Sequence, residues 1–526
     1  MSLSSALNIS ARALTVNQYA MDVVSNNIAN MNTEGYSKQR VNLGTVTNKI
    51  SIGESVERQI KADNGVQLES VTRYNNQFLK NYYRSQNSYS GFLAQNADLA
   101  SQLDKIMNEL SGTGLDAMLS NFYDALNNLN EYPTDSTARV NFIENAKSLV
   151  AKFSSLTEEL VATSGNAMGD GTRGSMESSM AYVAINDMNA KLDELAEVNG
   201  TLKRVQTGSL EANNLLDKRD KILNDLSEFY DFNVEENKNG TVKLSLGSMV
   251  LVDGENVKGK LEMVLPSEFY GGDDKVPEGS PNAIINVVDS EGSVVYKNIN
   301  DQMESGKLGA LVQAEKDDNG RLTAAKVVEQ LDLLANAIGN TFNQLQTREG
   351  AYCLNNTWSE LEKSTTPLFV GGFTETLEDG STVTTFKASD IRVNSEIENH
   401  LNLIAAAYFS DPSKVDKQAI GNSDNVIAML ATRNDKNVTG LDGQTFEEFY
   451  TSLVGKIAVQ TSSGSTAADA QAEVVSSLKN QITSETSVDL NEELTDLIKY
   501  QSAFAAAARV FNVCNSCFDI LVSLGS

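Results

Sequence analysis

Residues 3–28 read LSSALNISARALTVNQYAMDVVSNNI, and most positions spaced alternately four and three residues apart in this stretch are apolar. This heptad spacing predicts a single helix, roughly 40 Å long, with an apolar seam along its length. A second apolar stripe lies beside the seam, so the apolar face is wider than a two-stranded coiled coil requires. We therefore expect this helix to bury its face in an assembly. The seam residues expected at the interface are Leu3, Leu7, Leu14, Met21, Val24 and Ile28.

The opposite end of the chain repeats this pattern between residues 497 and 521, again with a second apolar stripe alongside. Burial of one Leu or Phe side chain is worth about 1.5–3 kcal/mol, which a solvent-exposed helix forfeits. We therefore predict that the two terminal helices pair as a coiled coil and also contact neighbouring subunits. The alternative is a two-helix lid over an ordinary core. The large seam residues expected at the interface are Leu497, Phe504, Phe511, Phe518 and Leu521.

The composition disfavours several functional classes. With 42 basic and 70 acidic residues, the chain has a formal net charge of −28, which argues against nucleic acids and anionic membrane surfaces as partners. No run of 18 apolar residues is present, so no membrane span is expected. The single histidine, His400, and the three cysteines provide neither a His-rich metal site nor a disulfide framework. We expect no metal, no cofactor and no His-based catalytic triad.

The 526 residues allow roughly three or four domains. None of the six prolines lies in 1–132 or 413–526, which permits long helices at both ends. The predicted fold is mainly α with β-rich inserts (α+β), in which paired terminal helices adjoin an elongated multi-helix body and a β-rich outer domain. The expected ranges are 1–45 and 481–526 for the terminal coiled-coil domain, 46–235, 305–350 and 391–480 for the helical body, and 236–304 and 351–390 for the β-rich inserts.

Three motifs that carry chemistry in other proteins have simpler interpretations here. Residues 254–260 fit most of a phosphate-binding loop, but Leu261 follows where a Ser or Thr is needed, and a hairpin is favoured. Cys514 and Cys517 form an isolated C-x-x-C within the apolar stripes of the last helix, where cysteine acts as a small hydrophobe. The acidic pairs at 273–274 and 317–318 lie in polar segments without the spacing of a calcium loop. No catalytic residue is therefore predicted.

The end of the first helix has an unusual density of turn-forming residues. Asn30, Asn32 and Gly35 are types that terminate helices and form turns, and Tyr36 follows directly. The simplest interpretation is a helix stop. We also predict that these four residues set the direction in which the chain leaves the first helix.

These segments resemble a known family. Residues 25–30 (SNNIAN), followed by Asn32-Thr33 and Gly35-Tyr36-Ser37, resemble the N-terminal signature of bacterial flagellar axial proteins, which are the rod, hook and hook-associated proteins. Residues 488–494 (VDLNEEL), 497–504 (LIKYQSAF) and 508–510 narrow the resemblance to the hook-associated proteins of the hook–filament junction. Further similar segments are 215–220 (LLDKRD), 306–311 (GKLGAL) and 421–425 (GNSDN).

Two departures from the family pattern are visible. Glu34 stands where a proline is common, and Thr486-Ser487-Val488 replaces a frequent Ser-Gly-Val. The first departure affects the turn after the first helix, and neither removes the resemblance.

The resemblance implies a structural protein of the bacterial flagellum and not an enzyme. It implies a junction ring of about eleven copies of this chain, with hook protein and hook-associated protein 3 as partners. The protein would be extracellular, exported unfolded through the flagellar type III apparatus without a cleavable signal peptide, and an export chaperone would bind its C-terminal helix. The terminal helices would be disordered in the free monomer and fold on assembly.

Two other interpretations stay open at the level of sequence. The chain could be another flagellar axial protein, such as hook protein or a distal rod protein, although the long helical body argues against this. A secreted hydrolase with a carboxylate pair in the middle region is a second alternative, for which no particular pair stands out.

Overall fold

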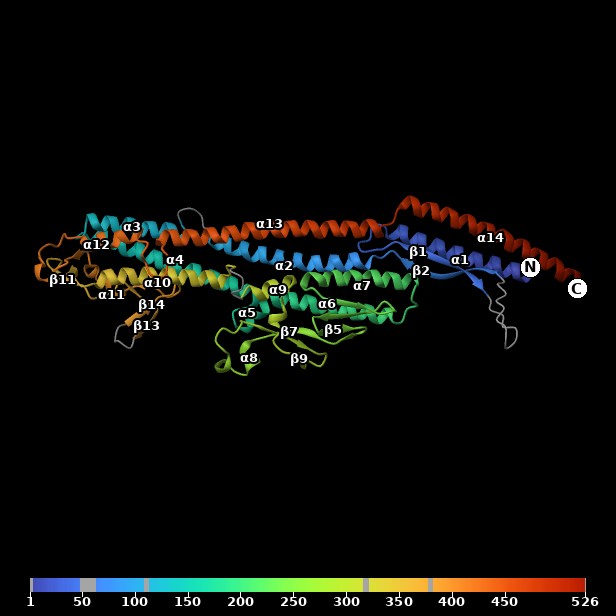
Figure 1. Cartoon of the computed structure of the whole chain (residues 1–526), viewed down its shortest axis with the longest axis horizontal. Coiled ribbons are helices and arrows are strands. Elements are labelled where there is room, and N and C mark those ends of the chain that lie inside the picture. The colour runs from blue at the N-terminus through green and yellow to red at the C-terminus, as the bar shows by residue number, and fades with distance from the viewer. Residues whose placement is uncertain (1–2, 48–62, 108–112, 316–320, 377–381, 526) are drawn as a thin grey trace.

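The computed structural model of the chain describes residues 3–47, 63–107, 113–315, 321–376 and 382–525. These residues form an elongated rod with both chain termini at the same end (Figure 1). Most of the rod is helical and several small antiparallel sheets are attached to it, which confirms the predicted α+β class.

The end that carries the termini is built from two long helices and a two-stranded ribbon. Helix α1 (Leu3–Asn30) packs lengthwise against α14 (Leu490–Gly525). Strands β1 (Gln39–Thr47) and β2 (Asp63–Arg73) pair antiparallel and lie against α1. A small core of Ala20, Val23, Val41 and Val71 joins the ribbon to the helix.

The expected domain boundary at residue 45 differs from the structure. That boundary places residues 46–73 in the helical body, whereas β2 completes the ribbon begun by β1. Because a strand is placed by its hydrogen-bonded partner, the ribbon is one unit and cannot be divided between two domains. Val66 and Leu68 alternate with the polar Gln67 and Glu69, a period-two signal too short to predict a strand.

A pair of long helices connects the two ends of the rod. Helix α13 (Phe446–Thr486) is 41 residues long and runs along α2 (Gln77–Met107) (Figure 1). Thr445 begins α13 with a reciprocal capping box, in which its hydroxyl accepts from the Glu448 N–H and the Glu448 carboxylate accepts from the Thr445 N–H. The pair forms a continuous connection between the terminal region and the far end.

The middle of the rod has its own core, made from several helices and two sheets. Gly208 lies in the break between the second and third helix of this region, whereas Gly200 lies inside a helix. The hairpin predicted around Gly254 is present, and a second hairpin surrounds residues 290–293. The elements are α5 (Arg173–Ser178), α6 (Met180–Leu202), α7 (Leu210–Phe229), β3 (Asn233–Glu236), β4 (Val242–Leu246), β5 (Met249–Asp253), β6 (Asn256–Val257), β7 (Lys260–Val264), α8 (Pro266–Tyr270), β8 (Ile284–Val288), β9 (Val294–Tyr296) and α9 (Gly306–Gln313).

The far end holds the largest core. Phe122, Phe142 and Phe342 meet there, with ring centroids 5.0–5.3 Å from Phe122 to each of the other two. The first part of α13 closes this core. The elements are α3 (Leu115–Glu131), α4 (Ser136–Met168), α10 (Ala324–Thr347), β10 (Ala351–Leu354), β11 (Leu361–Lys363), β12 (Phe369–Val370), β13 (Phe373–Thr376), β14 (Thr382–Thr385), β15 (Arg392–Val393), α11 (Ser395–Asn399), β16 (Ala407–Tyr408) and α12 (Asp424–Ala431).

The two β-rich inserts do not form one outer domain. Strands β3–β8 pack in or against the middle core with α6 and α7, whereas β12 and β15 contribute to the core at the far end. Figure 1 shows the two groups of strands at separate places along the rod. Each insert packs against helices that are close to it in the chain, as is usual for consecutive elements.

Candidate assembly site

The predicted seam of α14 divides into a covered part and an open part. Leu497, Phe504 and Phe511 are half-buried in the helix pair, and Cys514 is buried. Phe518 is 49% exposed and Leu521 is 60% exposed, so α1 does not cover the last turns of the seam. The structure therefore brings the first three of the five seam residues into the helix pair and leaves the last two open.

On α1 the two apolar stripes have different neighbours. Val24 is buried, and the other predicted seam positions, Leu3, Leu7, Leu14, Met21 and Ile28, are half-buried. The stripe beside the seam is covered more completely, because Ala20 and Val23 pack against the ribbon. The width of the apolar face thus has a local cause, since one stripe of α1 faces a helix and the other faces a sheet.

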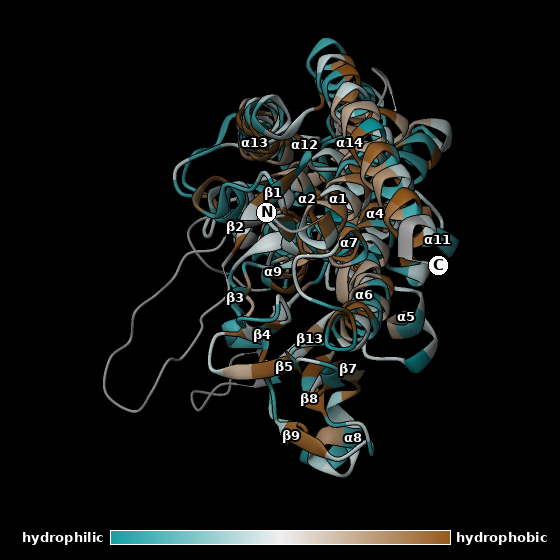
Figure 2. Cartoon of the chain, turned by 90° about the vertical axis from the view of Figure 1, so that its right-hand side faces the viewer, coloured by the Kyte–Doolittle hydropathy of each residue, from teal (hydrophilic) through white to brown (hydrophobic). Residues whose placement is uncertain are grey.

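The outer face of α14 remains apolar and open. Figure 2 shows hydrophobic segments along this helix. Ile498 and Val513 are each 63% exposed on it. A helix whose apolar face lacks a partner in its own chain is expected to find one in another chain. The exposed large apolar side chains of α14 are Leu490, Leu494, Ile498, Val510, Val513, Phe518, Ile520, Leu521 and Val522.

The chain leaves α1 through a hydrogen-bonded turn. Gly35 has φ +82°, a left-handed conformation that favours glycine. The Tyr36 hydroxyl returns to α1 and lies 2.9 Å from Asn26 Oδ1 and 2.8 Å from Asn27 Oδ1. Asn30 Nδ2 donates to the Asn26 carbonyl oxygen at 3.0 Å. Of the four residues predicted at this exit, three take part in the turn geometry, whereas Asn32 is an exposed residue of the turn.

Asn27, which the sequence argument did not single out, joins three elements. Its side chain is buried, and its Nδ2 donates to the Gln39 carbonyl oxygen at 2.9 Å and to Glu493 Oε2 at 3.0 Å. Its Oδ1 accepts from the Gln39 N–H at 3.0 Å. One amide thus connects α1, β1 and the start of α14. A polar residue within the apolar repeat of residues 3–28 was the available signal, since buried amides are normally fully hydrogen-bonded.

Lys38 holds the start of α14 from the other side. Its Nζ lies 2.7 Å from Glu492 Oε2 and 3.3 Å from Glu493 Oε1. Its backbone N–H donates to the Thr486 carbonyl oxygen at 2.8 Å, at the end of α13. Although burial lowers the pKa of Lys38, the two carboxylates outweigh burial and raise it, so the ammonium stays charged.

The contacts of Asn27 and Lys38 form a joint between α1, β1 and the start of α14. Next to this joint lies a group of buried charges, which we call the ion cluster. Asp220 is its centre, with Oδ2 at 2.7 Å from Lys80 Nζ and 2.9 Å from Arg73 Nη2. Its Oδ1 lies 2.8 Å from Arg219 Nη2 and 3.4 Å from Arg84 Nη2. These residues come from β2, α2 and α7, so the cluster joins the ribbon to the body. Its members are Arg73, Lys80, Arg84, Asp217, Arg219 and Asp220.

Burial and charge act in opposite directions on the two carboxylates of the cluster. Burial alone would raise the pKa of Asp220, but Arg73, Arg219 and the two α2 cations outweigh burial and hold its pKa far below the usual range. Asp217 has fewer cationic neighbours, and burial raises its pKa above the ordinary value. Asp220 is therefore the permanent negative charge of the cluster, and Asp217 is the carboxylate that accepts a proton first.

Asp217 also ties the cluster to the helix exit. Its Oδ2 accepts from the Ser37 N–H at 3.1 Å, and its Oδ1 lies 2.8 Å from Arg73 Nη1. Burial raises the pKa of the Tyr36 hydroxyl, and Asp217 and Glu493 raise it further, so this hydroxyl stays protonated and able to donate. The turn, the start of α14 and the body are thus connected by polar contacts.

We predict that Asn27→Ala loosens this joint. The substitution removes the partner of the Gln39 N–H and one partner of Glu493, and a buried polar group left without a partner costs about 1–3 kcal/mol. Amide hydrogen exchange in the assembled protein should become faster in β1 and in the first turns of α14. Asn32→Ala, in the exposed turn, is the control and should leave both segments unchanged. Equal exchange in the two variants would show that Asn27 does not hold the joint.

The candidate chemical motifs show no site among the described residues. No group of three or more His, Cys, Asp or Glu side chains in this part of the chain is placed to hold a metal ion. Gly254 lies in the turn between β5 and β6, as a hairpin requires. Cys514 is buried and Cys517 exposed, both within α14. Residues 273–274 form an exposed 3₁₀ turn, His400 is exposed, and the pair at 317–318 lies outside the described residues.

One helical region has the length and composition of a membrane span. Within residues 446–523, one window is apolar enough to cross a bilayer, and 6% of it is buried in the single chain. This is weak evidence for a span, because the open apolar face of α14 falls in the same region and an assembly face has the same composition.

A rod with paired terminal helices and an open apolar face defines a structural subunit of a larger assembly. A family model described as "Flagellar hook-associated protein FlgK helical domain" matches residues 100–356, and one described as "Flagella basal body rod protein" matches residues 7–36. Flagellar hook-associated protein 1 of Bacillus subtilis (strain 168) is 26% identical over 98% of this chain and 97% of its own length. The protein of the same name from Salmonella typhimurium (strain LT2) is 24% identical over 99% and 100%.

The fold has a solved counterpart. The structure of the flagellar hook junction protein FlgK from Burkholderia pseudomallei covers 78% of this chain and all of its own chain with a TM-score of 0.57, at 14% sequence identity. The chain is similar over nearly its whole length to curated proteins named flagellar hook-associated protein 1, and residues 100–356 match the helical-domain model of that family. It is a structural protein of the flagellar hook junction.

Proposed function

We propose that this chain forms the ring that joins the hook to the filament, by pairing α1 with α14 and packing the open face of α14 against neighbouring copies. The observation that supports this most directly is the open apolar face of α14, which a single chain leaves in water. About eleven copies related by a rotation would each present the same face to the next copy.

The proposed partners follow from the position of a junction. Hook protein would contact one side of the ring and hook-associated protein 3 the other. The chain would reach this extracellular position through the flagellar type III apparatus, unfolded and without a cleavable signal peptide. The apolar face of α14 would require an export chaperone before assembly, because an unshielded face of this kind promotes aggregation.

We also propose that the chain has no catalytic activity. Most acidic residues of the described part of the chain are exposed, and the buried Asp217 and Asp220 are already paired with the cations of the ion cluster, which is a poor catalytic signal. A purified full-length chain that cleaved a polysaccharide or a peptide would contradict this part of the proposal.

Deletion of the gene tests the junction role. We expect electron microscopy to show hooks without filaments, and we expect flagellin monomers to accumulate in the medium. Loss of hooks as well would indicate a rod or hook role, which is the remaining alternative. Normal filaments would contradict the proposal. Expression of the intact chain from a plasmid is the control and should restore filaments.

A further inference from the structure

The first half of α2 carries aromatic residues on a surface without acids. Residues 74–97 contain no Asp or Glu, although the chain has 70 acidic residues among 526. The two cations of this stretch, Lys80 and Arg84, are buried in the ion cluster with Asp220. These turns therefore add no exposed charge of their own, in a protein with a net charge of −28, and Glu485 of α13 accepts from Asn76 Nδ2 at 3.0 Å beside their start.

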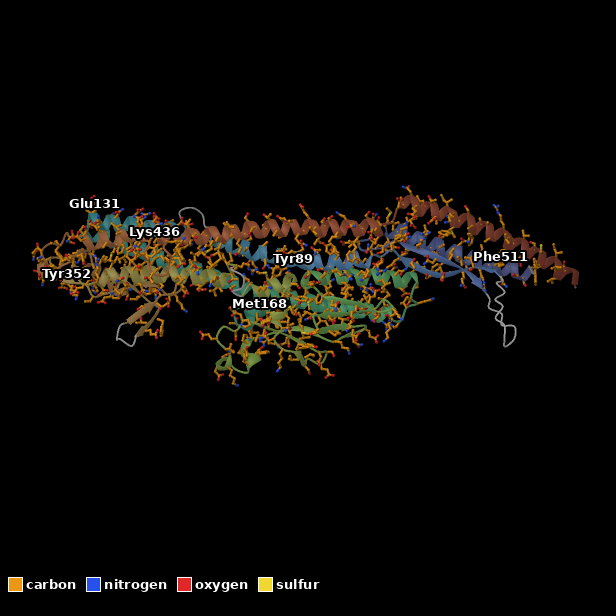
Figure 3. The ribbon with its side chains drawn as sticks, viewed as in Figure 1. Tyr89, Glu131, Met168, Tyr352, Lys436 and Phe511 are labelled. Atoms are coloured by element: carbon orange, nitrogen blue, oxygen red, sulfur yellow. The ribbon has the colours of Figure 1, made fainter. Side chains whose placement is uncertain are left out.

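Three aromatic side chains share one exposed face of α2. Phe78, Tyr82 and Tyr89 are spaced four and seven residues apart, which places them on one side of a helix. Phe78 is 80% exposed, and the two tyrosines are also exposed. We call these three residues the aromatic stripe. Figure 3 shows Tyr89 on α2, about midway along the rod, and Phe511 near the end that carries the termini.

The other faces of α2 have partners within the chain. Gln471 of α13 donates its Nε2 to Gln86 Oε1 at 2.9 Å, and Asp220 of α7 holds Arg84 and Lys80. These contacts fix the orientation of α2 and leave the aromatic stripe outside. The stripe is therefore an open apolar face on a well-packed helix, and tyrosine and phenylalanine are the residue types enriched in protein interfaces.

The stripe begins where the terminal helices meet the body. Tyr74, four residues before Phe78, lines a surface groove together with Arg40 of β1 and Tyr500 of α14. Lys38, which binds the start of α14, lies 5.9 Å from the centre of the Tyr74 ring. The aromatic stripe thus begins beside the contacts that join α14 to the body, where Tyr500 packs against the small core of α1 and the ribbon.

We propose that the aromatic stripe docks a second copy of this chain, the neighbouring subunit of the ring. Two copies with a net charge of −28 repel each other over most of their surface, and a neutral aromatic face lets them approach without that repulsion. A basic partner would instead be recognised by acids, which this face lacks. The inference rests on the proposed junction ring and names a surface through which the body of each subunit contacts the next.

Site-specific crosslinking in assembled flagella tests this contact. The photoreactive residue p-benzoylphenylalanine would replace Tyr82 in the full-length chain, expressed in cells without the native gene. Illumination of purified hook–basal bodies should give a covalent dimer whose crosslinked peptides both come from this chain. Tyr132, which is exposed to the same 52% as Tyr89 but lies beside Glu131 at the far end, is the matched control position and should give no such dimer.

A charge substitution provides the second measurement. Phe78→Glu combined with Tyr89→Glu should reduce the amount of this chain in purified hook–basal bodies by at least about tenfold, since burial of like charges opposes docking. Tyr132→Glu should not change that amount. Circular dichroism of the purified variants should match the native chain, because all three side chains are exposed.

The outcomes separate this inference from the proposed function. Crosslinks from position 82 only to a different protein, or no crosslink from positions 78, 82 and 89 in intact junctions, would overturn the stripe as a contact between copies. So would full incorporation of the double variant. In each of these cases the deletion experiment would still decide independently whether the chain joins hook to filament.

Discussion

Replacement of Asp220 by asparagine is expected to lower the free energy of unfolding of the full chain by about 3–5 kcal/mol. The carboxylate lies 2.7–2.9 Å from Lys80, Arg73 and Arg219, and all of these side chains are buried. Asparagine keeps the size of the side chain but removes the charge, which leaves buried cations without their central anion. Thermal unfolding followed by circular dichroism should show the loss as a lower midpoint.

Asp193→Asn is the matched control for this substitution. Asp193 also pairs with a cation, since its Oδ2 lies 2.7 Å from Lys260 Nζ, but both side chains are largely in water. Ion pairs of that kind contribute about 0–1 kcal/mol. Equal stability of the two variants would show that the ion cluster does not stabilise the fold.

The contribution of Asp220 to the free energy of unfolding depends on pH in a definite direction. Because the pKa of Asp220 is lower in the folded chain than in the unfolded chain, its contribution is fully present above the unfolded value of about 3.9. It is lost only as the pH falls through the folded pKa, in strong acid. Asp217 behaves in the opposite way, since burial raises its pKa and charging it costs stability. We therefore expect Asp217→Asn to be less destabilising than Asp220→Asn.

The terminal helices could be predicted from the sequence because a helix imposes its own period. The heptads of residues 3–28 and 497–521 lie within α1 and α14, and both proline-free ends contain long helices as expected. The range predicted for the helical body, 46–235, contains α2, but the sequence did not show which residues of α2 are buried. Leu79 is buried, whereas Phe78 and Tyr82 face water, because the contacts of α13 and α7 decide the orientation of α2.

The ion cluster could not be predicted for a related reason. Residues 217–220 read DKRD, a run of charges that is typical of a solvated helix face. Their burial depends on Arg73 and Lys80, which lie more than a hundred residues away in the chain. In the sequence, the segment LLDKRD stands out only by its resemblance to the family, and the structure supplies the physical role that the resemblance did not.

Replacement of Phe511 by aspartate is expected to prevent assembly while leaving the body of the isolated chain folded. Phe511 is half-buried on the side of α14 that pairs with α1, and neither of the two large cores contains α14. The substitution forfeits about 1.5–3 kcal/mol of apolar burial and adds a charge to an apolar seam. In a ring the loss recurs in every copy, so a modest cost per subunit becomes decisive for the assembly.

Two measurements on the same variant distinguish assembly from folding. Thermal unfolding of the purified Phe511→Asp chain should match the native chain, whereas cells that express it should carry hooks without filaments. Asn127→Asp places the same charge on an exposed polar position of α3, away from α14, and should support filaments. Normal filaments with Phe511→Asp would show that the pairing of α1 with α14 along this seam does not hold the junction together. A folded body without assembly would instead locate the assembly energy in the helix pair, where the heptads of both ends first indicated it.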